Sequence, residues 1–338
     1  MTPPPGDFEL VDPPVLSRGV MDRDEQLRFD TGYQRRTWRQ ARLVVVDENG
    51  RTAVSWETRP EATFRESDAA AWDSAAGSGG TIVTRAATTL GDEPPPDAVL
   101  LGAAEGIPYW TARGKPDLLA GEDPSEWADL RAAGAWLDDL GSALLTASVA
   151  VLNWHDTAGF CARDGSPTHP HNAGWARRCE AHGHEEYPRT DPSMICLVHD
   201  GADRVLLARQ PVWPEGRYSV LAGFVESGES LEACVHREVS EEVGIAVRDV
   251  RYLGSQAWPF PRSLMLGFHA TADANIPLNP ADGEIADALW ITRADLRAAL
   301  RRGDWGESPP EGERTVVLLP GKVSIARTML ESWAAQGD

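Results

Sequence analysis

Three glutamates stand at helical spacing in the stretch HREVSEEVGI: Glu238, Glu241 and Glu242. On an α-helix, residues i, i+3 and i+4 share a face, so these carboxylates project within an arc of about 100°. Like charges this close destabilise a helix unless a cation lies between them. Hard oxygen ligands on a partly open face suit Mg²⁺ or Mn²⁺ shared with the phosphates of a substrate. The stretch therefore predicts a helix with a divalent metal on one face.

The surrounding residues predict where this helix begins and ends. It should begin at about Ser230 and end at Val243, with Gly244 closing it. Val235 and Val239 continue along a neighbouring face towards Val243 and form an apolar ridge that can pack on a sheet. Acidic faces also occur on ordinary solvated helices, so the wider pattern has to decide between a metal site and a solvated surface.

A longer pattern encloses the helix. Its positions, separated by five, seven, one and one residues, are Gly223, Glu229, Arg237-Glu238-Val239, Glu241-Glu242 and Gly244-Ile245. This spacing matches the signature of the Nudix hydrolases, and the chain is identified as a member of that family. The resemblance implies an α/β fold: an α/β/α sandwich with a mixed sheet, preceded here by a zinc-ribbon-like module and an α+β N-terminal domain. It also implies metal-dependent hydrolysis of a nucleoside diphosphate linked to another group.

The resemblance also implies roles for the residues of this pattern. Glu238, Glu241 and Glu242 would be metal ligands, and Glu241 or Glu242 would orient or deprotonate the attacking water. Glu229 and Arg237 would hold the loop and the helix together through an ion pair. Gly223 and Gly244 complete the structural positions of the motif.

The segment SQAWPFPRS, from Ser255 to Ser263, combines two prolines with two large aromatic residues. Pro259 and Pro261 remove backbone donors, so the segment suits neither a helix interior nor a central strand. It resembles the SQPWPFPxS element of the NADH pyrophosphatase subfamily, with Ala257 where that subfamily usually has proline. The resemblance implies that eight residues contact the substrate: Gln256, Ala257, Trp258, Pro259, Phe260, Pro261, Arg262 and Ser263.

Trp258 and Phe260 suit this role because a rigid aromatic ring can stack on nicotinamide or adenine. A backbone already held by prolines loses little freedom when the ligand binds. The alternative is that the two rings form a hydrophobic plug between two domains.

The resemblance extends to four residues outside these motifs. Glu284 matches an acidic position that completes the metal site. Tyr187, Ala326 and Arg131 match substrate contacts, the last only if the alignment carries a one-residue gap. Without the family, Glu284, Tyr187 and Ala326 would be an acidic loop residue, a packed tyrosine and a helix-packing alanine.

Together the motifs imply an enzyme that cleaves NAD(H) to NMN(H) and AMP, and that can remove NAD caps from RNA 5′ ends. Members of the subfamily are usually homodimers, so we expect a homodimer. Two alternatives stay open: a Nudix hydrolase for ADP-ribose or another nucleoside diphosphate derivative, and an inactive module that senses a nucleotide. The intact Trp258-Pro259-Phe260-Pro261 run argues against the first, and the complete set of motif glutamates argues against the second.

A loop-rich stretch before the Nudix region keeps the spacing of a zinc ribbon but only half of its ligands. Where the subfamily has C-x2-C-x14-C-x2-C, this chain has Cys161, Asp164, Cys179 and His182. Cysteine, histidine and aspartate can all bind zinc, although structural sites favour sulfur and nitrogen. His184 is a competing ligand. The alternative is a ribbon without zinc that packing and hydrogen bonds hold together.

Hydrophobic periodicity divides the chain into three regions. We expect an N-terminal α+β domain over 1–155, with roughly the first 28 residues loosely ordered, a zinc-ribbon-like module over 156–190 and the Nudix domain over 191–338. The pattern predicts a hairpin across Glu48–Gly50 and one or two helices between Ser125 and Asn153. It predicts a second hairpin across Asp200–Asp203.

The composition restricts the partners of the chain. Asp and Glu outnumber Lys and Arg by 52 to 32, a formal net charge of −20. This charge repels nucleic-acid backbones and anionic membranes, since basic residues form no cluster. No apolar run is long enough to cross a bilayer and no secretory leader is evident, so we expect no membrane partner and a cytoplasmic location.

Overall fold

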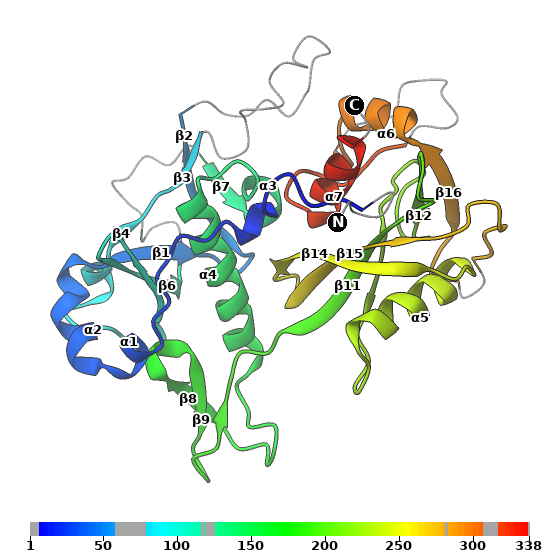
Figure 1. The fold of residues 1–338 in the computed structure, drawn as a ribbon. Helices are drawn as coiled ribbons and strands as arrows, with labels where there is room; N and C mark the ends of the chain where they lie inside the picture. The colour runs from blue at the N-terminus through cyan, green and yellow to red at the C-terminus, as the bar shows by residue number, and fades with distance from the viewer. Residues whose placement is uncertain are drawn as a thin grey trace, which may run out of the picture.

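The computed structural model describes residues 7–57, 79–115, 118, 126–280, 283–306 and 317–336. Figure 1 shows two lobes, the first from the N-terminal half and the second from the C-terminal half, with a small β module below the first lobe. Among the described helices, none combines the length and the apolar character that crossing a bilayer requires.

The first lobe consists of two small sheets and a long helix. One sheet has the strand order β4-β1-β6-β5 and the other β3-β2-β7. The long helix α4 packs against β1, β5 and β6, and its leucines join the buried core of this lobe. The strands are β1 Arg42–Val46, β2 Arg51–Trp56, β3 Gly80–Ile82, β4 Arg85–Ala86, β5 Val99–Ala104, β6 Ile107–Arg113 and β7 Glu126–Asp129. The helices are η1 Val15–Ser17, α1 Gln26–Phe29, α2 Thr31–Thr37, η2 Trp38–Gln40, η4 Ala87–Leu90, α3 Leu130–Ala133 and α4 Asp139–Thr157.

One local prediction in this lobe was wrong, and another held for most of its range. The chain turns at Glu48–Gly50, but β1 pairs in parallel with β6 while β2 pairs with β3 and β7, so no hairpin ladder forms. Val44 and Val45 have no exposed surface, which makes β1 a strand covered on both faces. The helices predicted between Ser125 and Asn153 are confirmed as α3 and α4, but Glu126–Asp129 form a strand, because pairing with β2 overrides the local periodicity.

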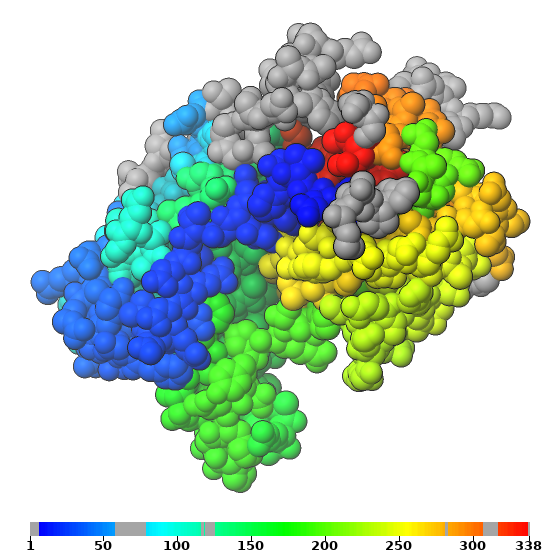
Figure 2. Space-filling view, in the orientation of Figure 1, coloured from blue at the N-terminus to red at the C-terminus, as the bar shows by residue number. Residues whose placement is uncertain are grey.

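The N-terminal segment is packed, contrary to the prediction of a loose lead-in. Phe8 is 6% exposed and its ring lies 4.9 Å from that of His269 in the second lobe. Leu16 is 5% exposed, and the hydroxyl of Ser17 donates to the carbonyl oxygen of Ser255 at 2.7 Å. Figure 2 shows this dark-blue segment running from the first lobe to the second. Burial of its apolar side chains orders it, whereas residues 1–6 lie outside the described residues.

The middle module is a small antiparallel sheet of order β10-β9-β8. Its elements are β8 Thr168–His171, η6 Asn172–Gly174, β9 Ala176–Cys179 and β10 Glu185–Glu186. A sheet this short buries little apolar surface, so other interactions have to stabilise it.

The second lobe is an α/β/α sandwich, as predicted. Its mixed sheet has the order β14-β15-β11-β12-β16, with β13 paired to β11. Helix α5 packs on one face of this sheet and forms one buried core with it. Helices α6 and α7 pack on the opposite face and form a second core. The elements are β11 Asp191–His199, β12 Arg204–Arg209, β13 Leu221–Phe224, α5 Leu231–Val243, β14 Arg248–Trp258, β15 Ser263–Thr271, β16 Asp287–Thr292, α6 Arg293–Arg302 and α7 Ile325–Ala334. The predicted hairpin across Asp200–Asp203 is confirmed, because β11 and β12 on either side of this turn pair antiparallel. The Asp200 amide closes the turn by donating to the Arg204 carbonyl oxygen at 3.0 Å.

Candidate active site

Helix α5 forms where the spacing predicted it. The Ser230 hydroxyl accepts from the amide of Ala233 at 3.2 Å and caps the first turn. Val235 and Val239 have no exposed surface, so the valine ridge packs on the sheet as predicted. Gly244 ends the helix at φ 73°, a left-handed conformation that favours glycine.

The three motif glutamates of α5 differ in exposure. Glu238 is 9% exposed and Glu242 is 3% exposed, whereas the Glu241 side chain is 54% exposed. Burial raises the pKa of Glu238, and the charges of Glu241 and Glu284 raise it further, against a hydrogen bond from Arg237. The fold thus brings Glu284, which lies in the segment before β16, within electrostatic range of the helix. Carboxylates gathered in this way favour a cation between them.

The backbone of β13 lies directly against the first of these glutamates. A Cβ added at Gly223 would lie 1.9 Å from Cδ of Glu238, so only glycine leaves room for that carboxylate. The next residue, Phe224, is 59% exposed beside the acidic face. The sequence pattern alone did not indicate Phe224, although an exposed phenylalanine next to a motif glycine is an unusual feature.

Arg237 connects the loop before α5 to the helix, through the predicted ion pair with Glu229. Its guanidinium donates to both carboxylate oxygens of Glu229 at 2.8 Å. The same group lies 3.0 Å from Glu238 Oε1 and 3.0 Å from Glu241 Oε2. Hydrogen bonds from Arg237 hold the pKa of Glu229 down at about 2. The loop and two of the candidate metal ligands therefore share one cation.

A cavity of about 610 Å³ brings four predicted site residues together from distant parts of the chain: Arg131, Glu242, Trp258 and Ala326. The Arg131 guanidinium lies 4.0 Å from the ring centroid of Phe260 and 5.9 Å from that of Trp258. The two rings meet edge to face, with centroids 5.0 Å apart. They also pack against the core of the first lobe, so the suggested plug between domains exists as well. Trp258 both joins the lobes and forms a wall of the cavity.

Other residues of the SQAWPFPRS segment lie elsewhere. Residues Ser255 to Trp258 end the edge strand β14, and the turn to β15 follows. Gln256 is fully buried, and its amide group joins the Leu16 amide (3.4 Å) to the Val323 carbonyl (3.0 Å). It therefore links three segments of the chain and does not line the cavity. A second cavity, of about 470 Å³, is lined by Ala257, Pro259, Arg262 and Ser263, while Pro261 is exposed.

Tyr187 lies apart from the cavity of its own chain. Its side chain is 62% exposed, and its hydroxyl donates to Glu185 Oε2 at 2.5 Å. The structure does not bring Tyr187 to the other predicted substrate contacts.

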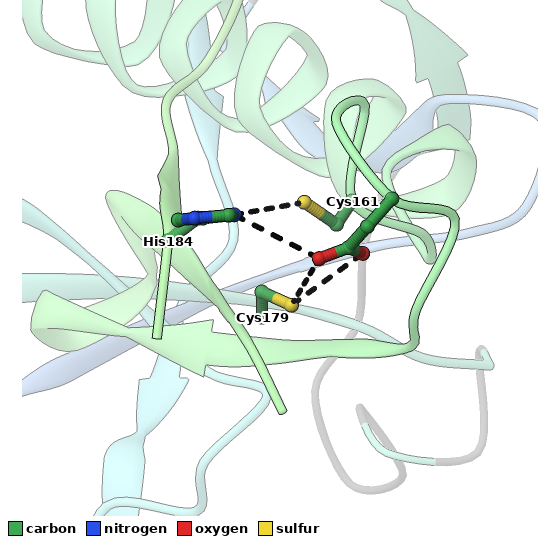
Figure 3. Close-up of side chains that lie close together, drawn as sticks. Cys161, Cys179 and His184 are labelled. Atoms are coloured by element: carbon green, nitrogen blue, oxygen red, sulfur yellow. Dashed lines mark hydrogen bonds and ion pairs between the residues drawn. The ribbon is translucent and has the colours of Figure 1, made fainter. Parts of the chain in front are cut away.

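The middle module gathers four side chains that suit a metal: Cys161, Asp164, Cys179 and His184. One ligand atom from each lies within 4.8 Å of all the others. Figure 3 shows the Cys161 sulfur facing the His184 ring, with the Cys179 sulfur close by. Cys161 Sγ is 3.8 Å from His184 Nδ1, and Cys179 Sγ is 3.5 Å from Asp164 Oδ2.

These separations fit a tetrahedral zinc ion, whose ligand atoms at about 2.0–2.3 Å from the metal lie roughly 3.3–3.8 Å from one another. The fourth side chain of this group differs from the predicted one, because His184 and not His182 lies with the two cysteines and Asp164. His182 is 61% exposed and its Nδ1 lies 2.8 Å from Asp164 Oδ2. In the turn that follows β9, the His184 side chain points towards the cysteines. The His182 side chain contacts Asp164 from the outer side.

Known families match the two parts of the chain that carry these clusters, the Nudix domain and the middle module. Two family models match, the NUDIX domain over residues 189–309 and the NADH pyrophosphatase zinc ribbon domain over residues 156–187. The NAD-capped RNA hydrolase NudC of Mycobacterium tuberculosis (strain ATCC 25618 / H37Rv) is 48% identical over 331 residues, 97% of this chain and 97% of that protein. The mitochondrial NAD(P)H pyrophosphatase NUDT13 of Mus musculus is 39% identical over 255 residues, 70% of this chain and 71% of that protein. The chain therefore belongs to the Nudix hydrolases, in the group of NADH pyrophosphatases and NAD-capped RNA hydrolases.

Proposed function

We propose that the chain hydrolyses the pyrophosphate bond of NAD(H), giving NMN(H) and AMP, and that it also removes NAD caps from RNA 5′ ends. The observation that carries this proposal is the cavity in which Glu242, from the Nudix helix, faces Trp258, Arg131 and Ala326. A volume of about 610 Å³ is in the range of small-molecule sites. The relatives named above act on the same chemical class.

Mg²⁺ or Mn²⁺ would be held by Glu238, Glu241, Glu242 and Glu284. These residues fit a divalent cation because the buried carboxylate of Glu238 is close to the negative charges of Glu241 and Glu284. Arg237 supplies the positive charge that partly balances them. A bound divalent ion would neutralise phosphate charge and lower the pKa of water.

The residues of the chain account for the other steps. Glu242 lines the cavity, so it is the better candidate to orient the attacking water and accept its proton, with Glu241 as the second candidate. Water attacks one phosphorus in line, and the bond from that phosphorus to the bridging oxygen breaks. The Arg131 guanidinium adds a positive charge to a cavity that receives a phosphate-bearing substrate.

For a capped RNA, only the cap has to enter the cavity. The net charge of −20 disfavours contact along an RNA chain. We therefore expect binding of capped RNA to depend mainly on the cap.

Three further expectations complete the proposal. The Cys161, Asp164, Cys179 and His184 cluster would hold a structural zinc ion. A homodimer would explain Tyr187, because a second subunit could bring this exposed residue to the cavity of its partner. The cytoplasmic location remains a prediction from the sequence.

One experiment separates the proposal from its rivals. The purified chain is incubated with NADH, NAD⁺ and ADP-ribose in Mg²⁺ or Mn²⁺, and the products are separated by chromatography. Release of AMP with NMNH or NMN, lost in Glu242→Gln and kept in Glu232→Gln on the exposed side of the same helix, supports the proposal. Turnover of ADP-ribose alone would favour a different Nudix substrate, and turnover of none would favour a nucleotide-sensing module.

A further inference from the structure

The turn that carries the two aromatic rings is held from the first lobe by a hydrogen bond to its backbone. Nδ2 of Asn153 donates to the carbonyl oxygen of Pro259 at 3.3 Å. Asn153 lies near the C-terminal end of α4, on the side of the first lobe that faces β14 and β15 (Figure 1). Pro259 stands between Trp258 and Phe260 in the chain, so this contact fixes the planar peptide unit that connects the two rings.

A second hydrogen bond sets the orientation of the Asn153 amide. The Arg113 guanidinium donates to Asn153 Oδ1 at 2.9 Å. A guanidinium group cannot accept a hydrogen bond, and a backbone carbonyl oxygen cannot donate one. The amide oxygen therefore has to face Arg113, and the amide nitrogen has to face Pro259.

Arg113 is itself fixed by the sheet of the first lobe. Strands β1 and β6 run parallel with Arg113 opposite Val46, so both strands end at the same edge of the sheet. There the guanidinium donates to the Asp47 carbonyl oxygen at 2.7 Å and forms an ion pair with Asp156 on α4. The Arg113 side chain is only 24% exposed. The sheet and α4 together thus set the position of the Asn153 amide.

The other contacts between the first lobe and this turn involve the aromatic rings. Arg131 on α3 lies over the Phe260 ring, and both rings pack against the buried core of the first lobe. The hydrogen bond from Asn153 holds the backbone between the rings instead. Trp258 also lines the cavity that contains Glu242. A shift of this turn would therefore change one wall of the cavity and leave the acidic residues of α5 in place.

We propose that Asn153 is a positioning residue for the substrate: together with Arg113 it holds the Pro259 carbonyl and thereby sets the place of Trp258 in the cavity wall. This inference rests on the proposed function. It gives the first lobe a part in substrate binding, because the chain of hydrogen bonds begins in the sheet of that lobe. Asn153 is not among the described residues that line the cavity, so it acts through Trp258. Its loss should raise KM and leave kcat nearly unchanged.

The substitution Asn153→Asp tests this role with little change of shape. A carboxylate still accepts from Arg113, but it cannot donate to Pro259 and places a negative charge against that carbonyl oxygen. We expect KM for NADH to rise about tenfold, the effect of exchanging one hydrogen bond for a repulsive contact, and kcat to stay within about twofold. Asn49→Asp is the matched control, because it makes the same change of charge at an exposed position of the first lobe. It should leave both constants unchanged.

A double-mutant cycle separates this role from a general effect on folding. If Asn153 acts through Trp258, Asn153→Asp should raise KM by less than about twofold once Trp258→Ala has removed the ring. Equal effects in both backgrounds would overturn the inference. If the double variant does not fold, the Kd of NADH without metal, measured by NADH fluorescence for Asn153→Asp alone, takes its place. A Kd raised in step with KM supports the inference, and an unchanged Kd overturns it.

The outcomes also separate this inference from the proposed function. Unchanged KM for NADH in Asn153→Asp, whether or not kcat falls, would overturn the positioning role alone, because the chain would still hydrolyse NADH. Absence of turnover of NADH and NAD⁺ by the wild-type chain would overturn the proposed function, and with it the role of Asn153 in binding this substrate.

Discussion

Arg237 holds both carboxylate oxygens of Glu229 at 2.8 Å and thereby ties the loop before α5 to the helix. The same guanidinium reaches Glu238 and Glu241 at 3.0 Å. Loss of the pair should misplace these two candidate ligands without removing either. We expect Glu229→Gln to lower kcat/KM for NADH by at least about tenfold, as replacement of outer-shell partners commonly does. Steady-state kinetics at several Mg²⁺ concentrations would check this, and a variant with wild-type kinetics throughout would contradict it.

Gly223→Ala should disable the site by steric contact. The new methyl group would lie 1.9 Å from Cδ of Glu238, so either the carboxylate or strand β13 has to move. We expect kcat/KM to fall by about 100-fold and the free energy of unfolding to fall by about 1–3 kcal/mol. Gly159→Ala is the matched control, because a Cβ there meets nothing within 4 Å. Equal activity of the two variants would show that the close approach of β13 to Glu238 does not matter.

Zinc content should distinguish the two histidines of the middle module. Because His184 Nδ1 lies 3.8 Å from Cys161 Sγ while His182 contacts Asp164 from the outside, His184→Ala should lose zinc and His182→Ala should keep most of it. We expect about one equivalent of zinc per wild-type chain by elemental analysis. Less than about a tenth of an equivalent in the wild-type chain would end the zinc hypothesis.

Stability should fall in mild acid because of a buried histidine pair. His199 Nε2 lies 3.2 Å from His269 Nδ1, and His269 Nε2 lies 3.0 Å from Asp7 Oδ1. Burial, with the charge of His269, lowers the pKa of His199 from 6.5 to about 4. The unfolded chain therefore takes up a proton near pH 6.5 and the folded chain only near pH 4. The free energy of unfolding should decrease by up to about 3 kcal/mol as the pH falls across this window.

Urea denaturation at several pH values would test this stability prediction. His199→Gln should flatten the dependence between pH 6.5 and 4, since glutamine takes up no proton there. His169→Gln, at an exposed position on β8, should not change it. The same slope in both variants would rule out His199 as the source.

Several features of the fold followed from local spacing alone. The helix from Leu231 to Val243, its buried valines and its glycine terminus depend on residues within one or two turns of each other. The Glu229–Arg237 pair spans eight residues and was expected from the motif. Local patterns did not predict contacts between distant segments. Strand β1 pairs with β6 and not with β2, and the N-terminal segment contacts residues about 240 positions away.

The sequence by itself thus determined the family, the Nudix helix and the set of acidic residues, because motif spacing is a local property. The tertiary structure decided which of those residues share a cavity. Arg131 meets Phe260 only because the two lobes pack together, and Trp213 reaches Trp305 only because loops after β12 and α6 converge. His184 replaced His182 at the cysteine pair for a similar reason, since the path of the turn, and not the residue type, sets which side chain points inwards.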